Sequence, residues 1–129
     1  MEQLTKHFNS ADTECHCGCG YNAPSSKLLN LAEKIRNLLE LPMIVHCVCR
    51  CQRHNKAVSG SGTSQHLYGR AMDFHVKSIS DHAHVCRIIK QAYDNGDLPE
   101  LGGLGLYDWG IHIDCRDTSQ LKYWDSRKF

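Results

Sequence analysis

The 129-residue sequence predicts an α+β fold in which a small antiparallel sheet is flanked by two principal helices. Apolar residues recur at three- and four-residue spacings in two long segments, which is typical of amphipathic helices. Elsewhere, short apolar segments rich in β-branched residues or glycine indicate strands. The length suits one domain, and we expect residues 1–129 to form it.

The two helical segments have clear boundaries. The first covers residues 26–40: Ser25 or Ser26 can supply the N-cap oxygen, and Pro42 ends the segment. Its predicted buried face is formed by Leu28, Leu31, Ala32, Ile35, Leu38 and Leu39. The second begins near Ser80-Asp-His and ends at Asn95-Gly. Its predicted buried face is formed by Val85, Ile88, Ile89, Ala92 and Tyr93.

Strands are predicted over residues 43–51, 71–76, 102–107 and 110–115, with a further edge strand near Lys122-Tyr-Trp. A turn near Asp108 joins the third and fourth segments into an antiparallel pair. Because side chains alternate along a strand, His112 and Asp114 are expected on the same face. The run Ser-Gly-Ser-Gly-Thr at residues 59–63 is predicted to be a loop.

Charge and hydropathy exclude several classes of protein. Fifteen basic and 14 acidic residues leave a formal net charge of +1, so no strongly basic face for nucleic acid is implied. No apolar run approaches the roughly 20 residues that a membrane span needs. The N-terminus has no hydrophobic segment of the signal-peptide type. We therefore expect no membrane span, and a cytoplasmic protein at synthesis or one whose export signal has been removed.

Cysteine is the unusual component, with eight residues in a biased distribution. Cys15, Cys17 and Cys19 alternate along the chain, and Cys47, Cys49 and Cys51 repeat that spacing; Cys86 and Cys115 stand apart. Disulfides, a structural zinc site and buried reduced thiols all remain open for the two triplets. The absence of a Cys-x-x-Cys pair argues against thiol–disulfide chemistry.

The chemistry-bearing segments are Ser64-Gln-His-Leu-Tyr-Gly-Arg-Ala-Met-Asp73 and Gly110-Ile-His-Ile-Asp114. His66, Asp73 and His112 offer two nitrogen ligands and one oxygen ligand, a set that can hold zinc and leave a fourth position open to water. Metal-bound water loses its proton near neutral pH, and the metal polarises a carbonyl. The set therefore predicts a metallopeptidase.

Ser64, His66, Gly69, Ala71 and Asp73 also reproduce the Ser-x-His-x-x-Gly-x-Ala-x-Asp signature of the M15 family of zinc D-Ala-D-Ala peptidases. The resemblance covers about residues 7–116 and is to the small single-domain branch. Its further matching segments are His7-Phe, Cys15-His-Cys-Gly-Cys-Gly, the helix at 26–40, residues 44–51, residues 52–58, Leu106-Tyr and His112-Ile-Asp. The resemblance implies a hedgehog/DD-peptidase-like fold, with His66, Asp73 and His112 as the zinc ligands.

The resemblance also suggests which residues meet the substrate. Arg50 falls where the family keeps an arginine, which can bind the substrate carboxylate or the oxyanion; a surface salt bridge is the alternative. Ser64 and Gln65 are expected to position the substrate backbone, although Ser64 can equally bond the amides of its own loop.

The general base is harder to assign. Many relatives have an acidic residue three positions before the last ligand, where this chain has Trp109. Asp108 and Asp114 are the two leading candidates, and a histidine or the lack of an efficient base is the remaining alternative; Asp114 can instead hold His112 in place. The remaining histidines are expected to be bystanders: of His16, His46, His54 and His75, His75 is the best placed to line the cleft because it shares a face with Asp73, and His82 and His84 are expected to be solvated.

The predicted function is hydrolysis of a peptide bond that contains a D-amino acid in peptidoglycan, by a D-Ala-D-Ala carboxypeptidase or a related endopeptidase. Members of the family are commonly bacterial carboxypeptidases or the cell-wall endopeptidases of phages. The expected cofactor is Zn²⁺, and the expected partner is the peptidoglycan stem peptide as substrate. We expect a monomer that reaches the cell wall through a holin or by another route of release. The alternative is a non-catalytic zinc-binding module that binds the cell wall or a partner.

Overall fold

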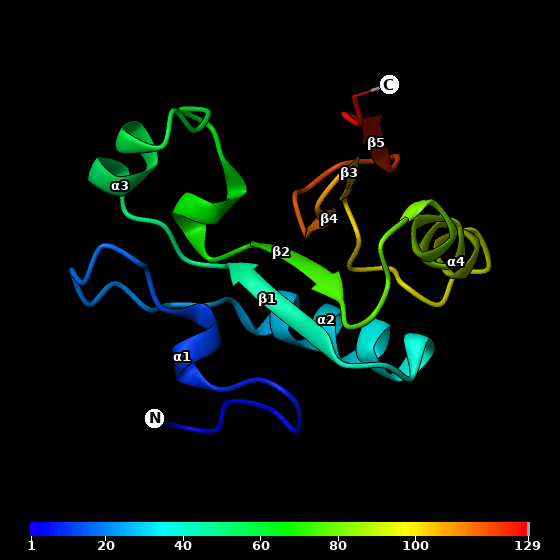
Figure 1. Cartoon of the computed structure of the whole chain (residues 1–129), viewed down its shortest axis with the longest axis horizontal. Helices are drawn as coiled ribbons and strands as arrows, with labels where there is room; N and C mark the ends of the chain where they lie inside the picture. The colour runs from blue at the N-terminus through cyan, green and yellow to red at the C-terminus, as the bar shows by residue number, and fades with distance from the viewer. Residues whose placement is uncertain (129) are drawn as a thin grey trace.

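The computed structural model describes residues 1–128. Its elements follow the chain as α1 (Ser10–Thr13), α2 (Ser26–Leu39), β1 (Met43–Cys47), α3 (Gln52–Ala57), the 3-10 helix η1 (Gln65–Tyr68), β2 (Ala71–Val76), α4 (Ala83–Asp94), β3 (Gly103–Tyr107), β4 (Gly110–Asp114) and β5 (Lys122–Asp125). The predicted α+β class is confirmed, and α2 and α4 are its two long helices (Figure 1).

The five strands form one open sheet in the order β1-β2-β4-β3-β5. The first four strands pair in antiparallel fashion, as predicted, with Asp73 directly opposite His112 in the β2–β4 pair. The predicted edge strand is also present, but β5 runs parallel to β3. It can do so because β4 ends opposite Gly103 and residues 115–121 cross the start of β3, so β5 begins beside Gly103 at the same end of the sheet.

Helices α2 and α4 supply the apolar cover of one sheet face. Leu28, Leu31 and Ile35 of α2 and Ile89 of α4 belong to the same buried cluster as Phe74 of β2. Alternation along the strands then turns Asp73 and its neighbours on β4 toward the opposite face. Figure 1 shows α3 and η1, which connect β1 to β2, close to each other and away from α4.

The strand predicted over residues 43–51 ends early, at Cys47. The β1–β2 register shifts between Val45 and Cys47, which makes His46 the extra residue of a β-bulge. Beyond it, the amides of Cys49 and Arg50 donate to the carbonyls of Thr13 and His66 instead of to a strand. The chain leaves the sheet here, and Cys51 becomes the N-cap of α3.

Two short helices were not predicted. Helix α1 begins with a capping box, in which the Asn9 side chain accepts from the Asp12 amide and the Asp12 carboxylate accepts from the Asn9 amide. Helix α3 has a cysteine rather than an oxygen-bearing residue as its N-cap. Among residues 1–128, no helix is both long enough and apolar enough to cross a membrane.

Candidate metal centre

Three elements bring His66, Asp73 and His112 together. Asp73 and His112 lie on adjacent strands in register, so their side chains project side by side from the same sheet face. His66 comes from η1, where the Ser64 hydroxyl accepts a hydrogen bond from the His66 amide at 3.2 Å. The turn ends at Gly69, whose φ of 64° is in the left-handed region. The convergence predicted for these three side chains is present.

The distances within the trio are short. His112 Nδ1 lies 2.7 Å from Asp73 Oδ1, and His66 Nε2 lies 3.1 Å from Asp73 Oδ2. One potential ligand atom from each residue lies within 4.8 Å of those of the other two. The two imidazole rings meet edge to face, with centroids 5.4 Å apart. One cation can therefore contact all three side chains.

The hydrogen bonds of His66 show that this trio suits a cation. Its Nδ1 lies 2.8 Å from the Val48 carbonyl oxygen, which can only accept, so Nδ1 carries the hydrogen. In the neutral ring, Nε2 then presents a lone pair. This atom is buried and has no hydrogen-bond partner among the described residues, because its approach to Asp73 lacks hydrogen-bond geometry. A lone pair that faces a carboxylate in a buried site is the arrangement a metal ligand needs.

His112 is held in place by Asp114. Its Nε2 lies 2.8 Å from Asp114 Oδ2, which leaves Nδ1 directed at Asp73. Asp114 is fully buried, and Arg116 donates to both of its oxygens, from Nε at 2.8 Å and from Nη2 at 2.6 Å. A Cβ on Gly103 of β3 would collide with the Asp114 carboxylate, so glycine is needed there.

The electrostatics of the trio follow from this packing. Burial disfavours charge on His66, but the Asp73 carboxylate, 3.1 Å from Nε2, and the Cys47 sulfur outweigh it and raise the pKa of His66 to about 10. The pKa of His112 is likewise raised against burial, by its bonds to Asp114 and Asp73. Burial would raise the pKa of Asp73, yet the two histidines hold it well below its usual range. Protons on the histidines thus balance the carboxylates, and a bound metal ion would replace those protons.

The comparison with protein families agrees with this geometry. The family model described as Peptidase M15 matches residues 2–114, most of the chain. The chain belongs to the peptidase M15 family. A comparison with curated proteins gives no match. Peptidases of this family are typically metal-dependent, and the trio of this M15 peptidase is a candidate metal-binding group.

Arg50 lies beside the metal centre. Its Nη1 donates to Asn55 Oδ1 at 2.9 Å, and its Nη2 lies 3.5 Å from the sulfur of Cys47, which in turn lies 3.6 Å from His66 Nδ1. No acidic side chain pairs with Arg50 within residues 1–128, so Arg50 does not form the surface salt bridge that was the alternative role for it. Nitrogen–hydrogen donors remain free on the guanidinium.

Ser64 and Gln65 differ in what they offer a substrate. The Ser64 hydroxyl serves its own loop by accepting from the His66 amide, which is the alternative considered for it. The Gln65 side-chain oxygen is buried and has no partner among the described residues. Their roles toward a substrate stay predictions.

The two candidate bases are placed very differently. Asp108 lies exposed in the β3–β4 turn, where its Oδ2 accepts from the Lys128 amide at 3.1 Å. No hydrogen bond or ion pair joins it to the trio in the described part of the chain, so a role as general base would require the turn to rearrange. Asp114 is joined to the trio, but as the partner of His112 and Arg116. Its pKa lies well below the usual range, because the bonds to Arg116 and His112 outweigh burial.

Aromatic and histidine side chains near the trio were largely missed by sequence reasoning. His75 lies on the same face as Asp73, as predicted, and its Nδ1 is 2.6 Å from Nε2 of His46 in the bulge. Trp109 lies 5.5 Å from His46, and Trp124 lies 5.2 Å from His112, between ring centroids. The period-two pattern of β5 could have placed Trp124 on this face, whereas the bulge left no signal in the sequence.

The expectation that His82 is solvated is wrong. Its ring is 3% exposed, and its Nε2 accepts from the Val76 amide at 2.9 Å. The hydrogen bond replaces a ladder partner at the end of β2, which explains why the ring is drawn inside. His84, two residues later, is exposed as predicted.

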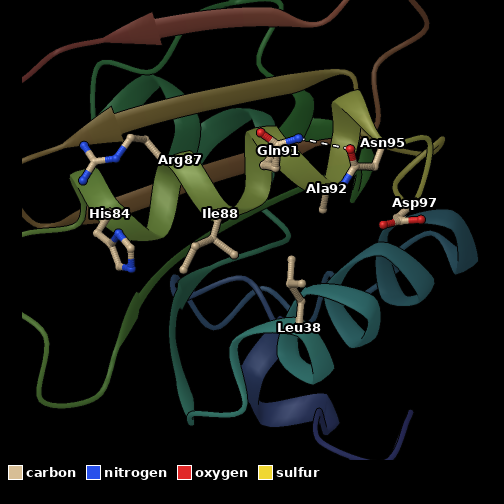
Figure 2. Close-up of a pocket in the computed structure, with 8 residues that line it drawn as sticks. All are labelled: Leu38, His84, Arg87, Ile88, Gln91, Ala92, Asn95 and Asp97. Carbon is tan, nitrogen blue, oxygen red and sulfur yellow. Dashed lines mark hydrogen bonds between the residues drawn. The ribbon is translucent and has the colours of Figure 1, made fainter.

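A hollow of about 380 Å³ between α2 and α4 is separate from the metal centre (Figure 2). Leu38 lines it from α2, and Ile88 and Ala92 line it from α4. Leu38, predicted to be buried, is 41% exposed there. The hollow lies in the helical layer, and none of the trio lines it.

Proposed function

We propose that this M15 peptidase is a zinc enzyme that hydrolyses D-amino-acid-containing peptide bonds of peptidoglycan, as a D-Ala-D-Ala carboxypeptidase or a related endopeptidase. The observation that carries the proposal is the position of His66 Nε2, which is buried beside Asp73 and His112 and has no hydrogen-bond partner among the described residues. The family supplies the reaction class, and the signature at residues 64–73 supplies the substrate class.

In this proposal His66, Asp73 and His112 hold the zinc ion through two nitrogens and a carboxylate oxygen. When bound, zinc supplies a polarised carbonyl and a water of lowered pKa. The chain itself fixes the ligands: the Val48 carbonyl sets the tautomer of His66, and Asp114 does the same for His112. Rigid ligands of defined tautomer lower the cost of assembling the site.

Arg50 is the residue we assign to the anionic part of the substrate. Its guanidinium contacts the Cys47 sulfur at 3.5 Å, and that sulfur lies 3.6 Å from His66 Nδ1. The guanidinium keeps unpaired N–H donors. Paired hydrogen bonds from a guanidinium suit a terminal carboxylate or a developing oxyanion. A preference for a substrate with a free D-alanine carboxylate would indicate the first role, and internal cleavage of the stem peptide would indicate the second.

The test is release of D-alanine from a pentapeptide ending in D-Ala-D-Ala, in parallel with digestion of purified peptidoglycan, each with and without a chelator. We expect turnover that chelation abolishes and zinc restores. His66→Ala should lose both the metal bound at the trio and the activity, while His84→Ala, which changes an exposed histidine, should keep both. Full activity of His66→Ala would overturn the proposal.

The same experiment addresses the rival function. A protein that retains metal through His66, Asp73 and His112 but cleaves neither substrate would be a zinc-binding wall module. Such a module would co-sediment with peptidoglycan, and no free amino groups from peptide-bond hydrolysis would appear in the supernatant. The position of Asp108, turned toward Lys128, is the observation that keeps this rival worth testing.

A further inference from the structure

A second group of potential metal ligands consists of the thiols of Cys15, Cys17, Cys19 and Cys51, which we call the thiol cluster. Their four sulfurs all lie within 4.8 Å of one another. The sulfur of Cys17 lies 3.5 Å from that of Cys15 and 3.6 Å from that of Cys51. All four cysteines are free thiols. The thiol cluster shares no residue with the trio of the metal centre.

The local backbone explains why these thiols meet. The Cys15 amide donates to the Tyr21 carbonyl at 2.9 Å, which closes a tight loop around the alternating cysteines. Gly18 and Gly20 have φ of 80° and 87°, values that residues with a side chain rarely adopt. This coiling turns successive thiols inward, whereas an extended Cys-x-Cys-x-Cys segment would place them in a row 6 to 7 Å apart, as roughly two residues of strand are.

Backbone amides point at three of the four sulfurs. The amide of Tyr21 donates to Cys19, that of Cys51 donates to Cys15, and that of His54 donates to Cys51, each at 3.4 Å. Amide donors stabilise the thiolate form, which is the form that binds metal. These three backbone amides would therefore stabilise the negative charge of the thiolates in the cluster.

The spacing of the sulfurs suits zinc. Four sulfurs at about 2.3 Å from one zinc ion in a tetrahedron lie about 3.8 Å from each other. The separations of 3.5 and 3.6 Å are close to that value and far from the roughly 2.05 Å of a disulfide. Small adjustments of side-chain rotamers would bring all four sulfurs to a common centre. Soft thiolate ligands select zinc over magnesium or calcium.

We propose that Cys15, Cys17, Cys19 and Cys51 bind one zinc ion as a structural tetrathiolate site, distinct from the metal centre formed by His66, Asp73 and His112. Four protein ligands leave no position for water or substrate, so the site is structural. Three ligands come from the first cysteine triplet and one from the second. Cys49 and Cys47 lie outside this group of sulfurs, Cys49 accepting from the Ala23 amide and Cys47 lying beside His66.

The site would fasten the N-terminal segment to the chain that leaves β1. That segment contains Arg50 and Val48, and the Val48 carbonyl orients His66. At present the two segments are joined by the Cys49 amide, which donates to the Thr13 carbonyl at 3.0 Å, and by the Cys51 amide. A zinc ion bonded to both segments would fix the position of Val48 more firmly than these hydrogen bonds alone.

The experiment counts metal ions per chain in the full-length protein after dialysis in a reducing buffer containing zinc. We expect two zinc ions in the wild type. The variant His66→Ala/His112→Ala should keep one, held by the thiol cluster, and Cys17→Ser/Cys51→Ser should also keep one, held by the trio. Cys115→Ser is the matched control, because its sulfur contacts Ser25 and the Arg70 carbonyl and does not belong to the thiol cluster, and it should keep two.

A second measurement, on protein whose cysteines are all unchanged, covers the case in which the cysteine variant fails to fold. Cobalt titration should produce the intense sulfur-to-cobalt charge-transfer absorption of a tetrathiolate, and the same band should appear in His66→Ala/His112→Ala. Alkylation followed by peptide mass analysis should show all four thiols of the cluster protected by zinc and released by a chelator.

Three results would overturn the proposal. One is a wild type with a single zinc ion that is lost in His66→Ala/His112→Ala. Another is cobalt binding without the sulfur charge-transfer band. The third is a disulfide among these four cysteines in protein that was never exposed to oxidant. None of these results depends on peptidase activity, so failure of the thiol cluster and failure of the proposed function are distinguishable.

Discussion

Replacement of Asp114 by asparagine separates a positioning role from a role as general base. The carboxylate accepts from His112 Nε2 at 2.8 Å, from Arg116 Nε and Nη2 at 2.8 and 2.6 Å, and from the Arg116 amide at 3.2 Å. Asparagine keeps one acceptor oxygen. If that oxygen keeps the place of Oδ2, which faces His112 and Arg116 Nη2, the new NH₂ group faces Arg116 Nε and the Arg116 amide, and those two bonds are lost together with the carboxylate charge.

The magnitude follows from these contacts. Arg116 is 27% exposed in its side chain, so water can rehydrate part of the guanidinium and the full cost of an unpaired buried charge does not arise. What remains is a weaker hydrogen bond behind a metal ligand, for which a loss of about 10- to 100-fold in metal affinity is typical. This corresponds to about 1.4 to 2.8 kcal/mol.

The assay is zinc competition against a chromophoric chelator at fixed pH, combined with kcat measured at saturating zinc. Asp114→Asn should weaken zinc binding at the trio by the amount above, and excess zinc should restore most of the activity. Asp117→Asn, an exposed neighbour, is the control and should change neither quantity. Unchanged zinc affinity together with a fall in kcat of about 100-fold or more would refute the positioning role and identify Asp114 as a proton acceptor.

Three further predictions concern Asp108, Glu33 and the effect of zinc on stability. Asp108→Asn should leave the metal content intact and change kcat by less than about threefold if the turn keeps its bond to Lys128; a fall of about 100-fold with metal retained would identify Asp108 as the base. Glu33 accepts from Thr5 and from the amide and ring of His7. Burial would raise its pKa, but these bonds lower it, so Glu33→Gln should cost about 1 to 3 kcal/mol in the free energy of unfolding at pH 7. Because the folded pKa is the lower one, this difference should be full above the ordinary glutamate pKa and vanish as the pH falls through the lowered value; a difference that persists at the acid end would contradict it. Finally, zinc at 100 times its dissociation constant should stabilise the fold by about 2.7 kcal/mol, a rise in Tm on the order of 10 °C that a chelator reverses, and an unchanged Tm would count against a folded-state metal site.

Much of the fold could be predicted because local pattern and packing agree. The apolar spacing in α2 placed Leu28, Leu31 and Ile35 in the core, where they lie. The hairpin around Asp108 was equally clear, since apolar residues alternate with glycine before the turn and with Gly110, His112 and Asp114 after it. The end of β1 could not be predicted, because Cys49 and Arg50 form their hydrogen bonds with Thr13 and His66, both remote in sequence.

The metal ligands were predictable from their chemistry and spacing, but their supports were not. The Val48 carbonyl that orients His66 has no side-chain signature, and its position depends on the bulge at His46. The tie between Asp114 and Arg116 could have been suspected, because opposite charges two residues apart on a strand share a face. His82 was misplaced because a helix start is usually solvated, whereas here its ring completes the end of β2.

The most direct test of the central claim, that one metal ion joins His66, Asp73 and His112, is anomalous diffraction at the zinc edge from crystals of the zinc-loaded protein. The account predicts a peak bonded to His66 Nε2, to an oxygen of Asp73 and to His112 Nδ1. A map with no peak between these three side chains, or with His112 turned away from the other two, would contradict it.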